Sequence, residues 1–447
     1  MDRASRLSES PPIQRAGFAP VAWSFRAHVV EHLDRTARIL APVAAFAIPV
    51  STSAAEICLG VICFCAFLSV CLDCICVGGF RERVSEIHRN PVAIACLALF
   101  AWMTIGVFYS SEGLAESFRM LMKYRPLLYV PILFTVLQDK RLQSYCLHAF
   151  VAAMYVTLAA SFLMKFGLLE NKWGNTASYA VFKNYITQSV MMAFAALIVA
   201  RTIVTTQRYR VLHIAILGLM LFNILYMSDG RTGYVVVIAL TLLFAKMHLG
   251  WRGLAQAFVA TAVLGMLVYF TSHKFRQRID RGVVEANLYF HGKAPGKSNS
   301  IGTRLRYYDD SLTLAGERPL FGYGTGAFKS AYVELATRTG VQATDNPHNE
   351  YLMILVQSGV IGLGLLVWLF FVQWMAALKL PTEQRVLACG VVLTLALGSI
   401  VNSLLLDTTE GNFFALFTGI CFAELSLRPV ATSLEESPAT DKAVLGR

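Results

Sequence analysis

Residues 344 to 364 read TDNPHNEYLMILVQSGVIGLG, in which a histidine and a proline stand at the start of a long apolar run. The run is centred near residue 364 and is long enough to cross a bilayer core, which takes roughly 20 apolar residues in a helix. Most other apolar runs of the chain begin or end with arginine, lysine or turn residues, so the imidazole of His348 is unusual here. The stretch therefore predicts a membrane-spanning helix with a candidate functional residue at its start.

The composition of the whole chain also indicates a membrane protein. Of its 447 residues, 56% are hydrophobic and 15% are charged, and the mean hydropathy is +0.55. About twelve apolar windows have the length of a spanning helix, and they centre at about residues 45, 67, 100, 129, 155, 192, 219, 240, 262, 364, 395 and 419. We therefore expect an all-α integral membrane protein with about 12 transmembrane helices.

Positive charge lies mainly on one side of these windows. Arginines are frequent in the N-terminal tail, and every second connection after it contains lysine or arginine. The opposite connections STSAAE, SSEGLAES, SDGRTG and DTTEG contain only Arg231 as a positive residue. Because cytoplasmic loops are enriched in lysine and arginine, both termini are predicted to be cytoplasmic. The net charge of +11 reflects this bias, and no nucleic-acid partner is expected.

The predicted organisation has five parts. They are a cytoplasmic N-terminal tail (1–35), transmembrane helices 1–9 (36–271), an outside loop (272–347), transmembrane helices 10–12 (348–427) and a cytoplasmic C-terminal tail (428–447). The loop has about 75 residues, far above the usual connection length, and is therefore expected to be functional. Within it, HKFRQRIDRG predicts a basic amphipathic helix, FHGKAPGKSNSIG predicts turns, and residues 303–316 and 327–338 have helical spacing.

Cationic residues recur at the outside ends of the predicted helices. They are Lys123 and Arg125 in MLMKYRPLLYVP, Arg231 in SDGRTG, Arg304 and Arg306 in GTRLRYYDD, and His348. Charges near the membrane are costly and indicate function by default. A cationic cluster without comparable carboxylates predicts a site for phosphate or diphosphate and no metal site. The simpler alternatives are contact of Lys123 and Arg125 with lipid headgroups, and an ion pair of Arg231 with Asp229.

The position of His348 suggests a role in proton transfer. Asn346 is expected to cap the following helix with Pro347 at its first position, which places His348 in the first turn. The helix dipole there disfavours imidazolium, so the ring should be neutral and able to accept a proton. A neutral base beside a cationic site fits glycosyl transfer, in which the arginines stabilise a departing diphosphate. The alternative is an interfacial histidine that only hydrogen-bonds to a carbonyl group.

Several segments carry a resemblance to a known family. They are His348 and Asn349 followed by Gly359 and Gly362, the loop segment with Arg304, Pro319, Gly322 and Gly324, the turn SDGRTGYV with Arg231, and the segments KYRPLLYVP and FKNYITQSVMMAFA. In these residues the chain resembles the superfamily of O-antigen ligases and O-antigen polymerases, which are bacterial envelope glycosyltransferases. Gly359, Gly362 and Gly364 are expected to allow close helix packing, and FGYGTGAF to form a tight turn with close backbone approach.

The resemblance implies an enzyme of the GT-C type at the periplasmic face of the bacterial inner membrane, so the outside loop would be periplasmic. It would transfer a glycan from undecaprenyl diphosphate to an acceptor with inversion, without a metal or a cofactor. His348 would be the base, and Arg231 and Arg304 would bind the diphosphate. Lys123 and Arg125 are weaker candidates for the same role. Asn349, Asp229 and Arg306 are supporting candidates, and Arg306 has no corresponding family position.

The branches of this superfamily differ in their acceptor. A ligase uses the lipid A core oligosaccharide, a polymerase uses another lipid-linked repeat unit, and a third branch glycosylates proteins. The short loops and the KYRPLLYVP segment favour the ligase, with lipid A core as acceptor and membrane lipids as surroundings. A polytopic transporter or flippase is the third hypothesis, and it should show broken helices or ionisable residues near the midplane of the membrane. Lys183 is the best candidate of that kind, although it lies near a helix end.

Overall fold

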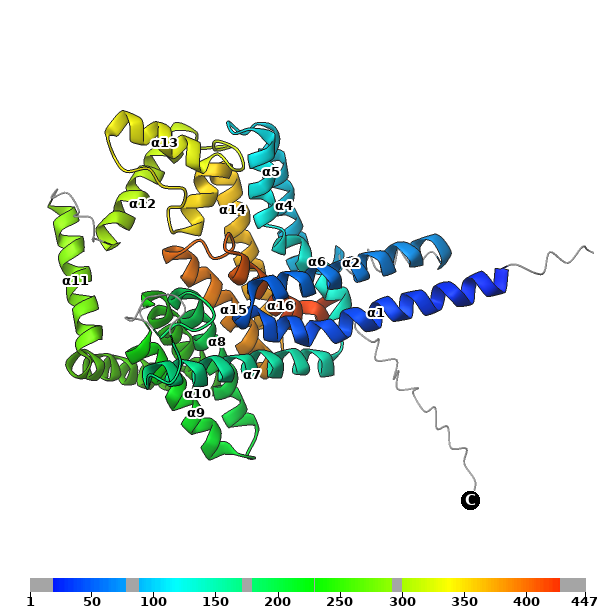
Figure 1. The fold of residues 1–447 in the computed structure, drawn as a ribbon, viewed down its shortest axis with the longest axis horizontal. Coiled ribbons are helices and arrows are strands. Elements are labelled where there is room, and N and C mark those ends of the chain that lie inside the picture. Colours follow the sequence, from blue (N-terminus) through cyan, green and yellow to red (C-terminus); the bar gives the residue numbers. More distant parts are fainter. Residues whose placement is uncertain (1–18, 78–87, 171–178, 229, 292–299, 427–447) are drawn as a thin grey trace, which may run out of the picture.

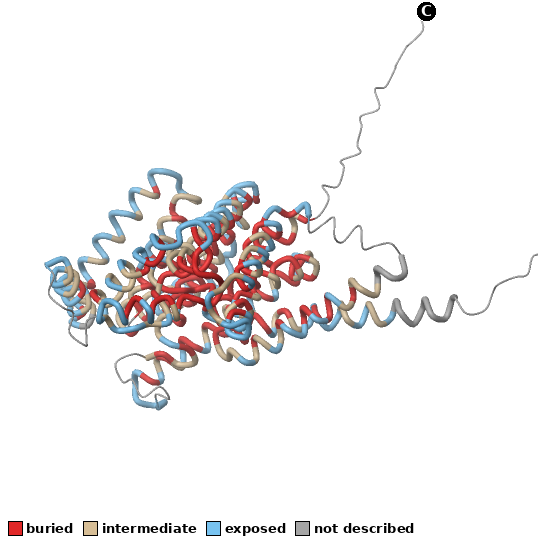
Figure 2. Tube along the Cα trace, turned by 90° about the horizontal axis from the view of Figure 1, so that it is seen from above, coloured by how far each residue is buried: buried red, intermediate tan, exposed pale blue. Residues whose placement is uncertain are grey.

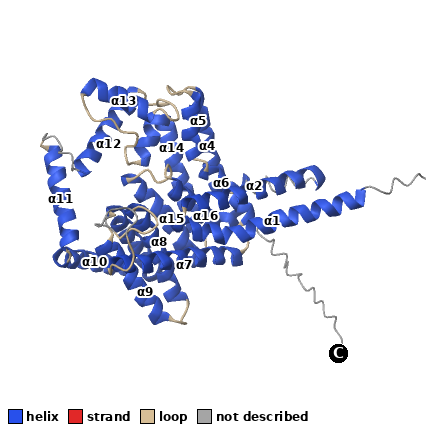
Figure 3. Cartoon of the chain, in the orientation of Figure 1, coloured by secondary structure: helices blue, strands red, loops and turns tan. Residues whose placement is uncertain are grey.

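The computed structural model describes residues 19–77, 88–170, 179–228, 230–291 and 300–426. All regular structure in these residues is helical (Figure 3), which confirms the predicted all-α class. The helices are α1 (Ala19–Val50), α2 (Thr52–Val77), α4 (Pro91–Phe108), α5 (Leu114–Lys123), α6 (Pro126–Val136), α7 (Lys140–Lys165), α8 (Tyr185–Thr205), α9 (Arg210–Phe222), η1 (Asn223–Met227), α10 (Arg231–Thr271), α11 (His273–Phe290), α12 (Ser300–Glu317), α13 (Phe328–Thr339), α14 (Glu350–Leu378), α15 (Thr382–Val401), α16 (Thr408–Phe422) and η2 (Ala423–Ser426).

Eight of the described helical segments are long and apolar enough to cross a membrane. They are α2, α4, α7, α8, α9 with η1, α10, α14 and α15. The predicted windows near residues 129 and 419 correspond to α6, with 11 residues, and α16, with 15 residues. These findings are consistent with a membrane-embedded chain. The number of 12 spans stays a prediction.

The predicted windows near residues 240 and 262 both lie in α10. Gly250 interrupts this 41-residue helix with φ 68° and ψ −154°. Such a left-handed backbone is accessible to glycine without a Cβ clash. The helix therefore consists of two segments joined at Gly250, which accounts for two apolar windows in one continuous element.

A second interruption, at Gly359, attaches the long connecting segment to α14. The backbone of Gly359 has φ 65°, and a Cβ atom there would lie 2.1 Å from the carbonyl oxygen of Leu320. The break allows the Val360 N–H to donate to the Pro319 carbonyl at 2.8 Å and the Tyr323 N–H to donate to the Val356 carbonyl at 2.9 Å. The expectation of close helix packing at Gly359 was wrong, because this residue instead admits the backbone of the 318–324 turn. The predicted tight turn in FGYGTGAF is confirmed.

The described residues between α10 and α14 form the helices α11, α12 and α13 (Figure 1). The predicted amphipathic helix begins at His273 as α11, and the two stretches with helical spacing form α12 and α13. Most of FHGKAPGKSNSIG lies outside the described residues. α12 packs against both α11 and α14. The segment is thus held against the bundle by the first part of α14.

Buried residues gather in the middle of the molecule (Figure 2). A group of aromatic rings from α7, α8 and α16 packs there, with Phe150 and Phe417 at 4.7 Å and Phe194 and Phe417 at 5.0 Å between ring centroids. Aromatic pairs at such distances add to the stabilisation from buried area. The packing holds α16 against α7 and α8.

Candidate functional site

Arg231 and Arg304 line one cavity of about 460 Å³. Arg231 is the first residue of α10, and Arg304 lies in the second turn of α12. The other lining residues are Tyr185, Ile186, Thr232, Arg278, Arg281, Glu285 and Ser300. The structure thus brings together two predicted residues that are 73 positions apart in the sequence.

Arg278 and Arg281 of α11 make the cavity more cationic than the sequence analysis expected. Their spacing of three residues places both on one face of the helix. Among the described residues that line the cavity, the one carboxylate is Glu285, which accepts a hydrogen bond from the Ile301 N–H at 2.8 Å at the start of α12. In the described part of the lining, four guanidinium groups and one carboxylate form a site suited to a multiply charged anion. The i, i+3 arginine pair was the available signal, but HKFRQRIDRG was interpreted only as an interfacial helix.

His348 lies just before α14 and not in its first turn. Asn349 is the N-cap, and its side chain accepts a hydrogen bond from the Leu352 N–H at 3.1 Å. The side chain of Asn346 instead accepts from the His348 N–H at 2.8 Å, and His348 adopts a left-handed φ of 54°. The prediction that Asn346 caps the helix was therefore wrong. An Asn side chain that binds the amide two residues later forms a turn that competes with helix formation.

The imidazole of His348 is half-buried beside the arginine cavity. Burial lowers the pKa of His348, the charge of Arg304 lowers it further, and Asp345 partly opposes both effects. The ring stacks on Tyr307, with 6.5 Å between the centroids. The expected neutral state at outside pH agrees with this direction of the pKa. Burial is the main cause of the lowered pKa, whereas the sequence analysis expected the helix dipole to be the cause.

The connection between α15 and α16, residues 402–407, joins the two sides of the site. The side-chain amide of Asn402 donates to the Thr232 hydroxyl at 2.8 Å, next to Arg231. The Ser403 hydroxyl donates to Asn346 Oδ1 at 2.8 Å, the same oxygen that binds the His348 amide. This connection was treated only as a short loop in the sequence analysis. Its polar residues have no recognisable pattern without their distant partners.

Lys123 and Arg125 do not belong to the set of residues that line the arginine cavity. Arg125 forms an ion pair with Glu56 and donates to the Met122 carbonyl at 2.7 Å. Lys123 lies near Asp407: burial raises the pKa of Asp407, and the charge of Lys123 opposes this rise. The 402–407 connection therefore has Lys123 near its end and the Arg231 and His348 groups near its start. A direct role of Lys123 or Arg125 with a diphosphate stays a prediction.

The supporting residues have different positions. Arg306 is exposed and faces Asp310 at 3.8 Å. It does not point in the same direction as Arg304, because residues two apart on a helix do not share a face. Asn349 serves as the helix cap described above. Asp229 lies outside the described residues, so its predicted pairing with Arg231 stays untested. Lys183 donates hydrogen bonds to Thr52 at 2.5 Å and to Thr409 at 3.3 Å, and thus ties together the starts of α2 and α16.

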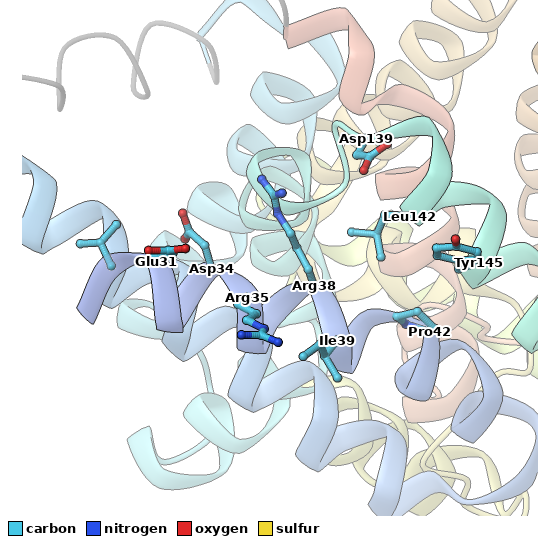
Figure 4. Close-up of a pocket in the computed structure, with 10 residues that line it drawn as sticks. Glu31, Asp34, Arg35, Arg38, Ile39, Pro42, Asp139, Leu142 and Tyr145 are labelled. Atoms are coloured by element: carbon cyan, nitrogen blue, oxygen red, sulfur yellow. The ribbon is translucent and has the colours of Figure 1, made fainter. Parts of the chain in front are cut away.

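A larger cavity of about 790 Å³ lies between α1 and α7 (Figure 4). Its charged lining residues have both signs: Glu31, Asp34, Arg35, Arg38 and Asp139. It contains none of the predicted site residues. Within the described part of the chain, no group of three or more His, Cys, Asp or Glu side chains is placed to hold a metal ion. The cationic cavity beside His348 is therefore the stronger candidate for an anionic substrate.

Residues 215–367 match the family model described as O-Antigen ligase. This match supports membership of the O-antigen ligase and polymerase superfamily. The matched residues include Arg231, Arg278, Arg281, Arg304 and His348, and they end before the 402–407 connection. An uncharacterized protein of Haemophilus influenzae is 22% identical over 332 residues, which cover 67% of this chain and 77% of that relative. The resemblance drawn from the sequence is thus confirmed at the level of the superfamily.

Proposed function

We propose that the chain is an O-antigen ligase that transfers a glycan from undecaprenyl diphosphate to the lipid A core oligosaccharide. The reaction would take place at the periplasmic face of the bacterial inner membrane, with both termini of the chain in the cytoplasm. The observation that carries the proposal is the cavity with four arginines beside a half-buried histidine, all within the segment that matches the ligase family. The alternation of basic and non-basic connections supports the orientation.

In this reaction an acceptor hydroxyl attacks the anomeric carbon of the donor glycan. The new bond joins the acceptor oxygen to that carbon, and the bond from the carbon to the phosphate oxygen breaks with its electron pair on the diphosphate. Attack from the face opposite the leaving group inverts the configuration. The guanidinium groups of Arg231 and Arg304 stabilise the charge that develops on the diphosphate, and Arg278 and Arg281 extend the same cationic surface.

The proton of the acceptor hydroxyl passes to the imidazole of His348. In the free protein the charge of Arg304 disfavours protonation of this ring. A bound diphosphate brings negative charge next to Arg304 and offsets that effect. The imidazole therefore becomes a better proton acceptor when the donor is in place, which couples proton transfer to donor binding.

A transfer assay with purified protein tests the proposal. The wild type is reconstituted with undecaprenyl diphosphate-linked glycan and lipid A core, and compared with Arg231→Ala and His348→Ala. Arg306→Ala is the matched control, because Arg306 lies on α12 near Arg304 but outside the cavity. We expect glycan-capped lipid A from the wild type and the control, and none from the other two variants.

Other products would refute the proposal in specific ways. Lengthening of the lipid-linked glycan without capped lipid A would identify a polymerase of the same superfamily. Transfer to a protein acceptor alone would identify the protein-glycosylating branch. Normal transfer by a folded His348→Ala variant would show that this residue takes no part in the chemistry. The Arg231→Ala variant would then decide by itself whether the arginine cavity is needed.

A further inference from the structure

Glu350 is a carboxylate with no solvent exposure at the first position of α14, two residues after His348. Its Oε1 accepts a hydrogen bond from the Tyr124 hydroxyl at 2.8 Å. Its Oε2 accepts two more, from the Leu405 N–H at 3.0 Å and the Leu406 N–H at 3.2 Å. Burying a carboxylate without hydrogen-bond partners would cost free energy, and three donors offset that cost here.

The backbone amides of Leu405 and Leu406 belong to the 402–407 connection, which contacts both sides of the candidate site. One side is reached through Asn402, which donates to Thr232 beside Arg231. The other side is reached through Ser403, which donates to the Asn346 oxygen that holds the His348 amide. Residues 402–407 lie between α15 and α16 and are not helical. Within them, the amides of Leu405 and Leu406 find their acceptor in Glu350, from a distant part of the fold.

We propose that Glu350 is a positioning residue that holds the 402–407 connection between the arginine side and the His348 side of the site. The carboxylate binds the amides of Leu405 and Leu406, and the connection in turn orients Thr232 and Asn346. The effect on transfer rests on the proposed ligase function. The effect on the connection does not, because it follows from hydrogen bonds within the chain.

The hydrogen-bond pattern separates this role from direct proton exchange with the substrate. In Glu350→Gln, the amide oxygen can accept from Leu405 and Leu406, and the amide nitrogen can donate to the Tyr124 oxygen. Both backbone contacts are thus preserved without an ionisable group, and the contact with Tyr124 is kept with its direction reversed. In Glu350→Leu, a side chain of similar size leaves both backbone amides and the Tyr124 hydroxyl without an acceptor.

A matched control lies on the same helix. Gln373 is also fully buried, and its side-chain amide donates to the Thr418 hydroxyl at 3.2 Å, away from the 402–407 connection. Gln373→Leu therefore removes a buried polar side chain of α14 without altering the partners of Leu405 and Leu406. It reports the general effect of such a change on the helix bundle.

The experiment measures two quantities in full-length protein reconstituted in lipid nanodiscs. One is amide hydrogen–deuterium exchange of peptides that cover residues 402–407. The other is the dependence of kcat/KM for transfer on pH. We expect Glu350→Leu to speed exchange in these peptides about tenfold or more and to lower kcat/KM by about a hundredfold. Glu350→Gln and Gln373→Leu should keep wild-type exchange, transfer within about threefold of wild type, and an unchanged pH profile.

Loss of transfer in a folded Glu350→Gln variant with wild-type exchange would overturn the proposal, because the carboxylate itself would then be required. Wild-type exchange in Glu350→Leu would overturn it as well. If Glu350→Leu does not fold, Ser403→Ala cuts the bond from the connection to Asn346 with Glu350 intact, and normal transfer by that variant would refute the role. If the wild type transfers no glycan, the ligase function fails, and the exchange data alone decide whether Glu350 holds the connection.

Discussion

Replacement of Arg278 by glutamine tests whether the arginines of α11 belong to the donor site. Arg278 lines the cavity together with Arg231 and Arg304. Hydrogen bonds to charged groups contribute about 1.5–3 kcal/mol each, and about 1.4 kcal/mol corresponds to a tenfold change in affinity. Arg278→Gln should therefore weaken binding of undecaprenyl diphosphate by about 10- to 150-fold. Arg276→Gln is the control, because Arg276 is on the same helix but does not line the cavity.

Titration calorimetry with undecaprenyl diphosphate and nanodisc-embedded protein gives the dissociation constants. The loss of affinity caused by Arg276→Gln should shrink more at high salt than the loss caused by Arg278→Gln, because salt screens a charge that acts from outside the cavity more than it screens a direct contact. Equal dissociation constants for the two variants at physiological salt would refute the assignment of α11 to the donor site. They would indicate that only the total charge of this helix matters.

Three further predictions follow from the same structure. Burial and Arg304 lower the pKa of His348 in the free protein, so kcat/KM for transfer should persist below pH 6.5. Arg304→Gln should move the acid limb of the remaining pH dependence of kcat/KM to higher pH. Gly359→Ala should lower the free energy of unfolding by about 2 kcal/mol or more, since Gly359 has φ 65° and its Cβ would meet Leu320; Gly364→Ala, with open space around it, is the control in thermal denaturation. Transfer should survive EDTA, and loss that magnesium restores would contradict metal independence.

Local sequence patterns determined most of the helices and the cationic residues of interest. The apolar windows depend only on residues close in sequence, and the bilayer length fixes what they form. The expected helix starts were less secure where two suitable residues compete. Asn346 and Asn349 are both good caps, and only the contact of Asn346 with Ser403 and the His348 amide shows why the second one begins α14.

The sequence by itself predicted a membrane-embedded helical chain that resembles the ligase and polymerase superfamily, and it pointed to Arg231, Arg304 and His348 as candidate site residues. Only the tertiary structure decided which groups surround them. Arg278 of α11 approaches the cavity because α11 packs on α12, and Glu350 binds amides 55 and 56 residues away. The physical reason is that hydropathy and helix propensity act over neighbouring residues, whereas the partners of a buried polar group are chosen by the packing of distant elements.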